Sequence, residues 1–279
     1  MHRGRWKFTL ITSLGASLAA LAFTLPAPRA VADARAQSER ISIQDIPSLP
    51  FTDFLPGVQV KPVVGQMGTF VYAELDPGAR TPPHHHTHEQ ANFGLGGSNE
   101  ISIGGRTYQL AKSGGTLVPP DAEHFVVNSG SNRAALLEFQ PIRRLDLLPP
   151  RPPTTYPSAP EAASVPEDAR VSLDFQYMTS DWQNTSRGVR RKVLAGKTCA
   201  LVVWDVVGSD ATNTDLGTRT TKAERFAYVA AGHIELMVGD VKRKLGPGTL
   251  FLIPRTVAHL PIHVIWHEHA VIVGFDPTP

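Results

Sequence analysis

The chain has 279 residues, of which 42% are hydrophobic and 19% are charged. This length and apolar content suffice for two small domains or one large domain with a packed core, and they exclude a chain that is disordered overall. Lysine and arginine exceed aspartate and glutamate by only two, 27 against 25, so no basic surface indicates a nucleic-acid partner. The single cysteine, Cys199, excludes an intrachain disulfide.

Residues 1–34 are typical of an export signal. A positively charged start precedes an apolar run from Phe8 to Leu25, and residues 30–34 contain the small-x-small sequences that signal peptidase accepts. An uncleaved membrane anchor is the alternative, because the run approaches the roughly 20 residues that span a bilayer. The serines, threonines and glycine of the run favour the cleaved signal. This predicts a periplasmic or secreted mature protein without stable membrane insertion.

The rest of the chain shows strand patterns and no convincing helical period. Apolar and polar residues alternate over short runs such as 100–103 and 235–238, and a period of two predicts strands with one buried face. Gly104-Gly105 and Gly239-Asp240 fit the two-residue loops of hairpins, because glycine accepts a positive φ. Many short strands with glycine and proline turns predict an all-β sandwich or barrel.

Four histidines lie within five positions between predicted strands: His84, His85, His86 and His88. Residues i and i+2 of an extended segment point to the same side, so His84 and His86 can bind one ion together. Neutral imidazole is the commonest metal ligand in proteins. His124 follows a predicted hairpin and can return to this pair as a third ligand.

The composition changes abruptly to a proline-rich stretch, and we predict a linker at 147–170. It separates a first domain at 35–146 from a second domain at 171–279. The two halves repeat each other at an offset of 135 residues, as the step from Gly97 to Gly232 shows, and no gap is needed across the matched stretch. Further matched pairs are Ile101 with Leu236, Ile103 with Val238, Leu110 with Leu245, Pro119 with Pro254, and His124 with His259.

The histidine segment resembles the first motif of the cupin superfamily, G-x5-H-x-H-x3-E-x6-G. The positions of that motif are occupied by Gly78, His84, His86, Gln90 and Gly97. Glutamine therefore stands where the family usually has glutamate.

The region around His124 resembles the second cupin motif, G-x5-P-x-G-x2-H-x3-N. Pro119, His124 and Asn128 match it, whereas Ser113 and Asp121 replace its two glycines. Both motifs in this order imply a bicupin, an all-β chain of two tandem RmlC-like barrels of the jelly-roll or double-stranded β-helix type.

Carried over from the family, the metal ligands of the first barrel are His84, His86, Gln90 and His124. A shifted register that uses His86 and His88 is the alternative, although it breaks the spacing to the two motif glycines. Glu89 is expected to face away from the ion, because neighbouring residues of a strand point in opposite directions. The cofactor would be a divalent metal ion, and Fe, Mn, Ni, Cu and Zn all stay open.

The second half lacks these ligands. At the same offset, Arg219 and Thr221 take the two histidine positions, Arg225 takes that of the amide, and His259 matches His124. Arginine stays protonated and cannot bind a cation, so we expect no such metal site there. We interpret the second barrel as a structural partner, with an anion pocket at Arg219 and Arg225 as the alternative.

Three neutral imidazoles and one neutral amide leave the charge of a divalent ion uncompensated, which favours an anionic partner such as an enolate, a phenolate or superoxide. The resemblance thus implies an exported metal-binding bicupin, and we predict a dioxygenase that acts on a small diketone, phenolic or other oxygen-bearing substrate. The alternatives are a secreted small-molecule-binding cupin without turnover and a cupin isomerase or decarboxylase.

An enzyme of this kind also needs an acid or base near the metal, and the candidates are Tyr72, Glu74, Arg80 and Glu138. The expected partner is a small-molecule substrate or ligand. Homo-oligomerisation stays open, because two barrels can bury their edges within one chain.

Overall fold

The computed structural model describes residues 41–110, 112–148, 182–186, 188–206, 214–215, 224–238, 241–254, 262–266 and 269–277. The predicted export signal and residues 149–170 of the predicted linker lie outside this set. The described residues form strands and two short 3-10 helices, which confirms the predicted all-β fold. None of these helices has the length and apolar character that a membrane crossing requires.

The first half forms two antiparallel sheets. The larger has the strand order β2-β3-β4-β10-β5-β8 and the smaller β7-β6-β9. Gly104 and Gly105 join β6 to β7 with φ values of 55° and 80°, which confirms the predicted hairpin. The strands are β2 (Thr52–Leu55), β3 (Val58–Val64), β4 (Thr69–Leu75), β5 (Gln90–Gly96), β6 (Asn99–Ile103), β7 (Arg106–Leu110), β8 (Gly115–Val118), β9 (His124–Asn128) and β10 (Ala134–Gln140).

The second half repeats this arrangement. Its larger sheet has the order β1-β18-β15-β20-β13-β12-β11, and its smaller sheet β14-β19-β16-β17. The strands are β11 (Gln183–Ser186), β12 (Val189–Ala195), β13 (Cys199–Val206), β14 (Thr214–Asp215), β15 (Arg225–Ala231), β16 (Ile234–Val238), β17 (Val241–Leu245), β18 (Thr249–Ile253), β19 (Ile262–Trp266) and β20 (Val271–Pro277).

The first strand, β1 (Ser42–Asp45), belongs to the sheet of the second half. Ser42 pairs with Leu252 and Asp45 with Thr249. The following 3-10 helix, η1 (Ile46–Ser48), continues the contact, because the Ile46 N–H donates to the Gly248 carbonyl over 3.0 Å. Residues that precede the first barrel in sequence therefore complete the edge of the second.

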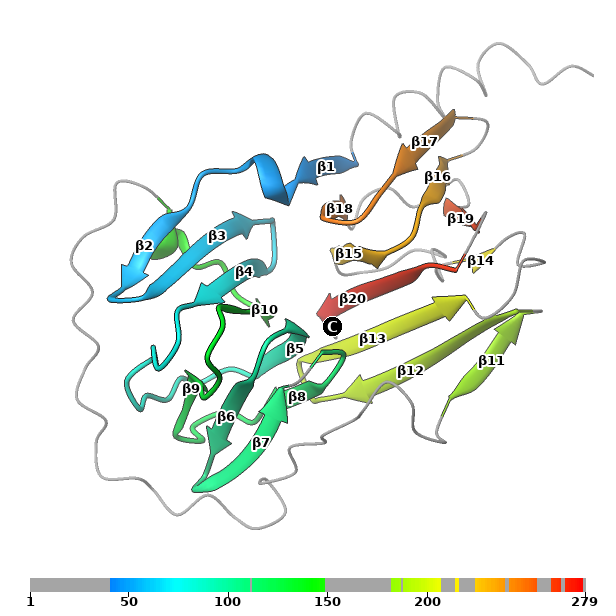
Figure 1. Cartoon of the computed structure of the whole chain (residues 1–279). Coiled ribbons are helices and arrows are strands. Elements are labelled where there is room, and N and C mark those ends of the chain that lie inside the picture. Colours follow the sequence, from blue (N-terminus) through cyan, green and yellow to red (C-terminus); the bar gives the residue numbers. More distant parts are fainter. Residues whose placement is uncertain are drawn as a thin grey trace, which may run out of the picture.

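The two large sheets pack face to face, and each small sheet covers the outer side of its own large sheet (Figure 1). Aromatic rings fill the space between the large sheets: the centroid of the Phe139 ring lies 5.1 Å from that of Phe226 and 5.3 Å from that of Phe275. The same cluster contains Phe70, Phe93 and the fully buried Cys199. Burial of apolar area at roughly 25 cal/mol per Å² stabilises this contact, so the barrels share a core.

The strand register corrects one predicted match of the repeat. Ile103 pairs with His124 in the first barrel, and its counterpart Val238 pairs with Ile262 in the second. The counterpart of His124 is therefore Ile262, and the prediction that His259 takes this position was wrong. The gapless repeat ends before β19, where the offset grows from 135 to 138 residues (262 minus 124). His259 itself lies outside the described residues.

Candidate metal centre

The three predicted histidine ligands converge from two facing segments. His84 and His86 lie in the loop before β5, and His124 begins β9. Two backbone hydrogen bonds link the segments, from the His84 N–H to the His124 carbonyl (3.0 Å) and from the His124 N–H to the His84 carbonyl (2.8 Å). The ring centroid of His124 lies 4.3 Å from that of His84 and 4.8 Å from that of His86.

Each of these rings is oriented by a backbone carbonyl. Nδ1 of His84 donates to Pro82 (2.8 Å), Nδ1 of His86 to His88 (2.6 Å) and Nδ1 of His124 to Ala122 (2.9 Å). A carbonyl can only accept, so the hydrogen of each neutral ring resides on Nδ1. The lone pair of each Nε2 is then the metal-binding donor, as in protein sites where the second ring nitrogen is held by a carbonyl.

Burial favours the neutral form of the His84 and His124 rings. It lowers the pKa of His84 to about 4 and holds the pKa of His124 well below its usual range. Nε2 of His124 is buried and has no hydrogen-bond partner. An unsatisfied buried polar atom is costly, and a bound cation would satisfy this one.

Gln90 brings the fourth predicted ligand atom beside His86. Its side chain is 3% exposed, and its Oε1 lies 3.0 Å from Nε2 of His86. Nε2 of Gln90 donates to Asn92 (2.9 Å), which turns Oε1 toward the histidine. Two acceptors thus face each other at the separation of about 3.0 Å that neighbouring ligands of one octahedral ion have.

The predicted metal-ligating atoms do not surround one common point in this structure. Among the described residues, no three His, Cys, Asp or Glu side chains are spaced to hold a metal ion. Three imidazoles bound at about 2.1 Å place their centroids roughly 4.5–5.5 Å apart, whereas the rings of His84 and His86 are 6.2 Å apart. The donor set fits a first-row metal chemically, and the His84 or His86 ring must turn inward to complete the site.

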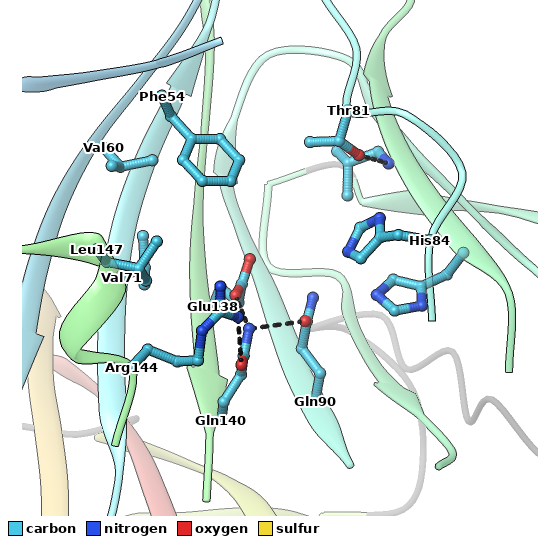
Figure 2. A pocket seen from close by; sticks show the side chains of 12 residues that line it. Phe54, Val60, Val71, Thr81, His84, Gln90, Glu138, Gln140, Arg144 and Leu147 are labelled. Atoms are coloured by element: carbon cyan, nitrogen blue, oxygen red, sulfur yellow. Dashed lines mark hydrogen bonds between the residues drawn. The ribbon is translucent and has the colours of Figure 1, made fainter. Parts of the chain in front are cut away.

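A cavity of about 50 Å³ adjoins this cluster. Figure 2 shows Gln140 between Gln90 and Glu138: its Nε2 donates to both, and its Oε1 accepts from Arg144 over 3.0 Å. Burial raises the pKa of Glu138, so this carboxyl group can carry a proton beside the cavity. The remaining lining residues are Phe54, Val60, Val71, Thr81, His84, His124, Val126 and Leu147.

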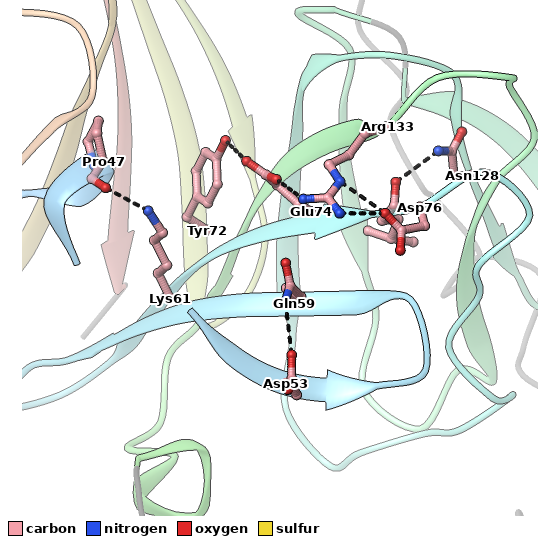
Figure 3. Close-up of polar contacts among 10 residues, drawn as sticks. Pro47, Asp53, Gln59, Lys61, Tyr72, Glu74, Asp76, Asn128 and Arg133 are labelled. Carbon is pink, nitrogen blue, oxygen red and sulfur yellow. Dashed lines mark hydrogen bonds and ion pairs between the residues drawn. The ribbon is translucent and has the colours of Figure 1, made fainter. Parts of the chain in front are cut away.

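Of the four candidate acid–base residues, only Glu138 lines this cavity. Figure 3 shows Tyr72 and Glu74 in another network, in which the Tyr72 hydroxyl donates to Glu74 (2.8 Å) and Glu74 pairs with Arg133 (3.1 Å). Arg80 is exposed and stacks on the Phe125 ring at 4.6 Å.

His88 and Glu89 occupy different surroundings. The His88 ring stacks on that of His86, with centroids 4.0 Å apart, and its Nε2 lies 2.8 Å from Oε1 of Gln140. Burial lowers the pKa of His88 to about 4. Glu89 faces the second barrel, which confirms that it points away from the predicted ligands.

In the second barrel an ion pair takes the place of the glutamine pair. Phe139 pairs with Ala91 in the first barrel, and Phe275 pairs with Phe226 in the second. Arg225, which precedes Phe226, therefore corresponds to Gln90, which precedes Ala91. Asp276, which follows Phe275, corresponds to Gln140, which follows Phe139. Nε and Nη2 of Arg225 donate to the two carboxylate oxygens of Asp276 over 2.6 and 2.7 Å. This contact gives Nε and Nη2 of Arg225 a structural role, whereas its Nη1 is buried without a hydrogen-bond partner among the described residues. Arg219 and Thr221 lie outside the described residues.

Comparison with known proteins identifies the family that the first half resembles. A family model for the cupin domain matches residues 71–139, a range that contains all four predicted ligands. Residues 71–139 are a cupin domain. No curated protein matches the chain by sequence.

The chain resembles several solved structures over most of its length, bicupins among them. The putative glyoxylate-induced protein of Pseudomonas aeruginosa has a TM-score of 0.64 at 11% identity and covers 85% of this chain and 88% of its own. Oxalate decarboxylase of Bacillus subtilis has a TM-score of 0.60 at 13% identity, with 84% and 76% covered. Salicylate 1,2-dioxygenase of Pseudoaminobacter salicylatoxidans has 0.55 at 13%, with 76% and 70% covered. The fold is therefore that of a bicupin.

Proposed function

We propose that the first cupin barrel binds a divalent first-row metal through His84, His86, Gln90 and His124. The observation that carries this proposal is the buried acceptor Nε2 of His124, which lies in one cluster with His86 and Gln90. Nε2 of His124 has no partner, and Nε2 of His86 faces Oε1 of Gln90. A cation shared by these atoms replaces unfavourable contacts with coordination bonds.

We further propose that the loaded site is a dioxygenase centre for a small oxygen-bearing substrate such as a diketone or a phenol. The metal supplies a Lewis acid whose charge the neutral ligands leave uncompensated, which favours an anionic substrate. Burial raises the pKa of Glu138, and the hydrogen bond from Nε2 of Gln140 orients this carboxyl group beside the cavity. The volume of about 50 Å³ favours the smallest substrates of this class. The fold shared with a salicylate dioxygenase supports the reaction class.

The experiment that tests this function is metal analysis of the purified mature protein, followed by oxygen uptake with small diketones, flavonols and catechols. We expect one metal per chain and oxygen consumption with at least one substrate. Glu138→Gln should keep the metal and lower kcat by about 10²-fold or more, as loss of a general acid or base does. Retained metal without oxygen uptake on any substrate would reject the dioxygenase. N-terminal sequencing of the exported protein tests cleavage after the proposed signal at 1–34.

A second candidate function is binding of a small molecule without turnover. A cavity of about 350 Å³ lies between the barrels, with Phe93 and Leu95 on one side and Ala231 and Val271 on the other. This volume falls in the range of about 300–1,000 Å³ typical of small-molecule sites, which are mostly apolar. Native mass spectrometry of the purified protein tests this function: a retained small molecule supports it, and turnover at the metal site in the absence of any retained molecule rejects it.

A further inference from the structure

A single carboxylate of the first barrel holds a turn of the second. Glu89 is 4% exposed and accepts the backbone N–H groups of Lys197 (2.7 Å), Thr198 (2.6 Å) and Cys199 (3.1 Å). The Thr198 hydroxyl donates to the same group over 2.9 Å. These donors belong to the turn between β12 and β13 and to Cys199, the first residue of β13. Four hydrogen bonds to one buried carboxylate make a strong and well-defined contact, because bonds to a charged acceptor are stronger than neutral ones.

The second barrel makes the equivalent contact, in which one of its carboxylates binds a turn of the first barrel. Glu224, the counterpart of Glu89 at the offset of 135 residues, accepts the N–H groups of Gln66 (2.7 Å) and Met67 (3.0 Å) in the turn between β3 and β4. A glycine leaves room for each carboxylate. A Cβ atom at Gly196 would lie 2.4 Å from Glu89, and one at Gly65 would lie 2.2 Å from Glu224.

The two glutamates differ in their neighbours along the chain. Glu224 precedes Arg225, which is paired with Asp276. Glu89 precedes Gln90, and it shares a peptide bond with His88, whose carbonyl orients the His86 ring over 2.6 Å. Fixing the position of Glu89 therefore fixes the backbone that holds both His86 and Gln90. The strands involved, β5 and β13, lie side by side in Figure 1.

We propose that the second barrel positions the metal ligands of the first through Glu89. The inference rests on the metal site of the proposed function and gives the second barrel a role in it. Glu89 is a positioning residue: its carboxylate is held by the turn at 197–199 and acts on the site through the orientation of His86 and Gln90. Residues that orient metal ligands in this way typically contribute 10- to 100-fold to metal affinity.

The test compares Glu89→Gln with Glu224→Gln in the full chain. Co²⁺ is the probe, titrated into the metal-free protein and followed by its visible absorption, and urea unfolding is measured on the same samples. Both substitutions weaken a contact between the barrels, so both are expected to lower the unfolding midpoint. Only Glu89→Gln is expected to weaken Co²⁺ binding, by at least about tenfold, with a changed absorption spectrum.

A second variant guards against a folding defect at Glu89. Thr198→Val removes one donor from the second barrel, nearly preserves the side-chain shape and leaves the first barrel untouched. We expect Co²⁺ binding to weaken by about two- to fivefold, less than in Glu89→Gln, because three of the four hydrogen bonds to the carboxylate stay in place. A parent protein that binds no Co²⁺ overturns the proposed metal site and with it this inference. If the parent protein and both variants, Glu89→Gln and Thr198→Val, bind Co²⁺ with the same affinity, the positioning role is overturned and the proposed metal site stands.

Discussion

The two barrels place different chemistry at the same point of the same fold. In the first, Gln90 and Gln140 lie beside three histidines, and Nε2 of His124 has no partner. In the second, Arg225 and Asp276 close the equivalent position with a two-point ion pair. The difference is one of charge: among the described residues, the first barrel leaves a neutral acceptor without a donor, whereas the second holds an ion pair at the equivalent position and leaves only the donor Nη1 of Arg225 without a partner. A cation can therefore gain a ligand in the first barrel and not in the second.

The largest expected effect concerns the metal ligands themselves. His86→Ala should lower metal affinity by more than about 100-fold, because it removes a ligand of the proposed site. His88→Ala should retain stoichiometric metal, because the His88 ring stacks on His86 and contacts Gln140. Metal content after gel filtration measures both. Equal losses in the two variants would show that His86 and His88 form the ligand pair.

A smaller effect is expected from the ion pair of the second barrel. The Arg225 side chain is 11% exposed, and Asp276→Asn leaves its charge without a full partner, so the free energy of unfolding should fall by about 2–3 kcal/mol. The double variant Arg225→Gln with Asp276→Gln copies the glutamine pair of the first barrel and should recover part of this loss. Urea unfolding measures both variants. A double variant no more stable than Asp276→Asn would contradict the structural equivalence of the two pairs.

The neutral histidines of the first barrel make its stability depend on pH. Burial lowers the pKa of His84 to about 4, below the value of about 6.5 in an unfolded chain. The unfolded state therefore binds more protons between these values, and stability that is present above pH 6.5 is lost as the pH falls toward 4. At pH 5 the metal-free protein should lose about 1–2 kcal/mol through this residue. Urea unfolding of His84→Asn should show a weaker loss between pH 7 and pH 5, and an unchanged loss would contradict the assignment.

The smallest effect is expected at a turn that the two barrels build differently. Ser113 has a φ of 70°, and its counterpart Gly248 at the offset of 135 has a φ of 90°. A left-handed conformation costs about 1–2 kcal/mol for a residue other than glycine, partly offset by the backbone entropy that glycine loses. Ser113→Gly should therefore raise the free energy of unfolding by about 0.5–1 kcal/mol.

The reverse change should be unfavourable. Gly248→Ser adds a Cβ atom 2.7 Å from the Pro47 ring, so it should lower stability in the same unfolding assay. A destabilising Ser113→Gly would mean that the serine side chain makes a compensating contact.

Much of the candidate site could be read from residue spacing. His84 and His86 at i, i+2 with a returning His124 predicted the cluster, and the structure brings these rings together. Ser113 and Asp121, which replace the two glycines of the second motif, both have a positive φ in the structure. Spacing works here because each of these features depends on local backbone geometry.

Other site residues carried a weaker signal. Glu138 and Gln140 are polar and alternate on the otherwise apolar strand β10, which places them on one face. That pattern marks Glu138 as an inward carboxyl group, although its proximity to Gln90 depends on the pairing of β5 with β10. Tyr72 and Glu74 show the same alternation, yet they form a network away from the cavity.

The sequence by itself determined the all-β fold and the duplication, and it supplied the candidate metal ligands as a prediction, because strand period, turn chemistry and motif spacing are properties of short segments. Only the tertiary structure decided that β1 joins the second barrel, that Ile262 rather than His259 corresponds to His124, and that Glu89 ties the ligand segment to the turn at 197–199. These features depend on which strand edges pair and how two barrels pack. These three features are formed by backbone hydrogen bonds and buried contacts between segments far apart in the chain, so no pattern within one short segment predicts them.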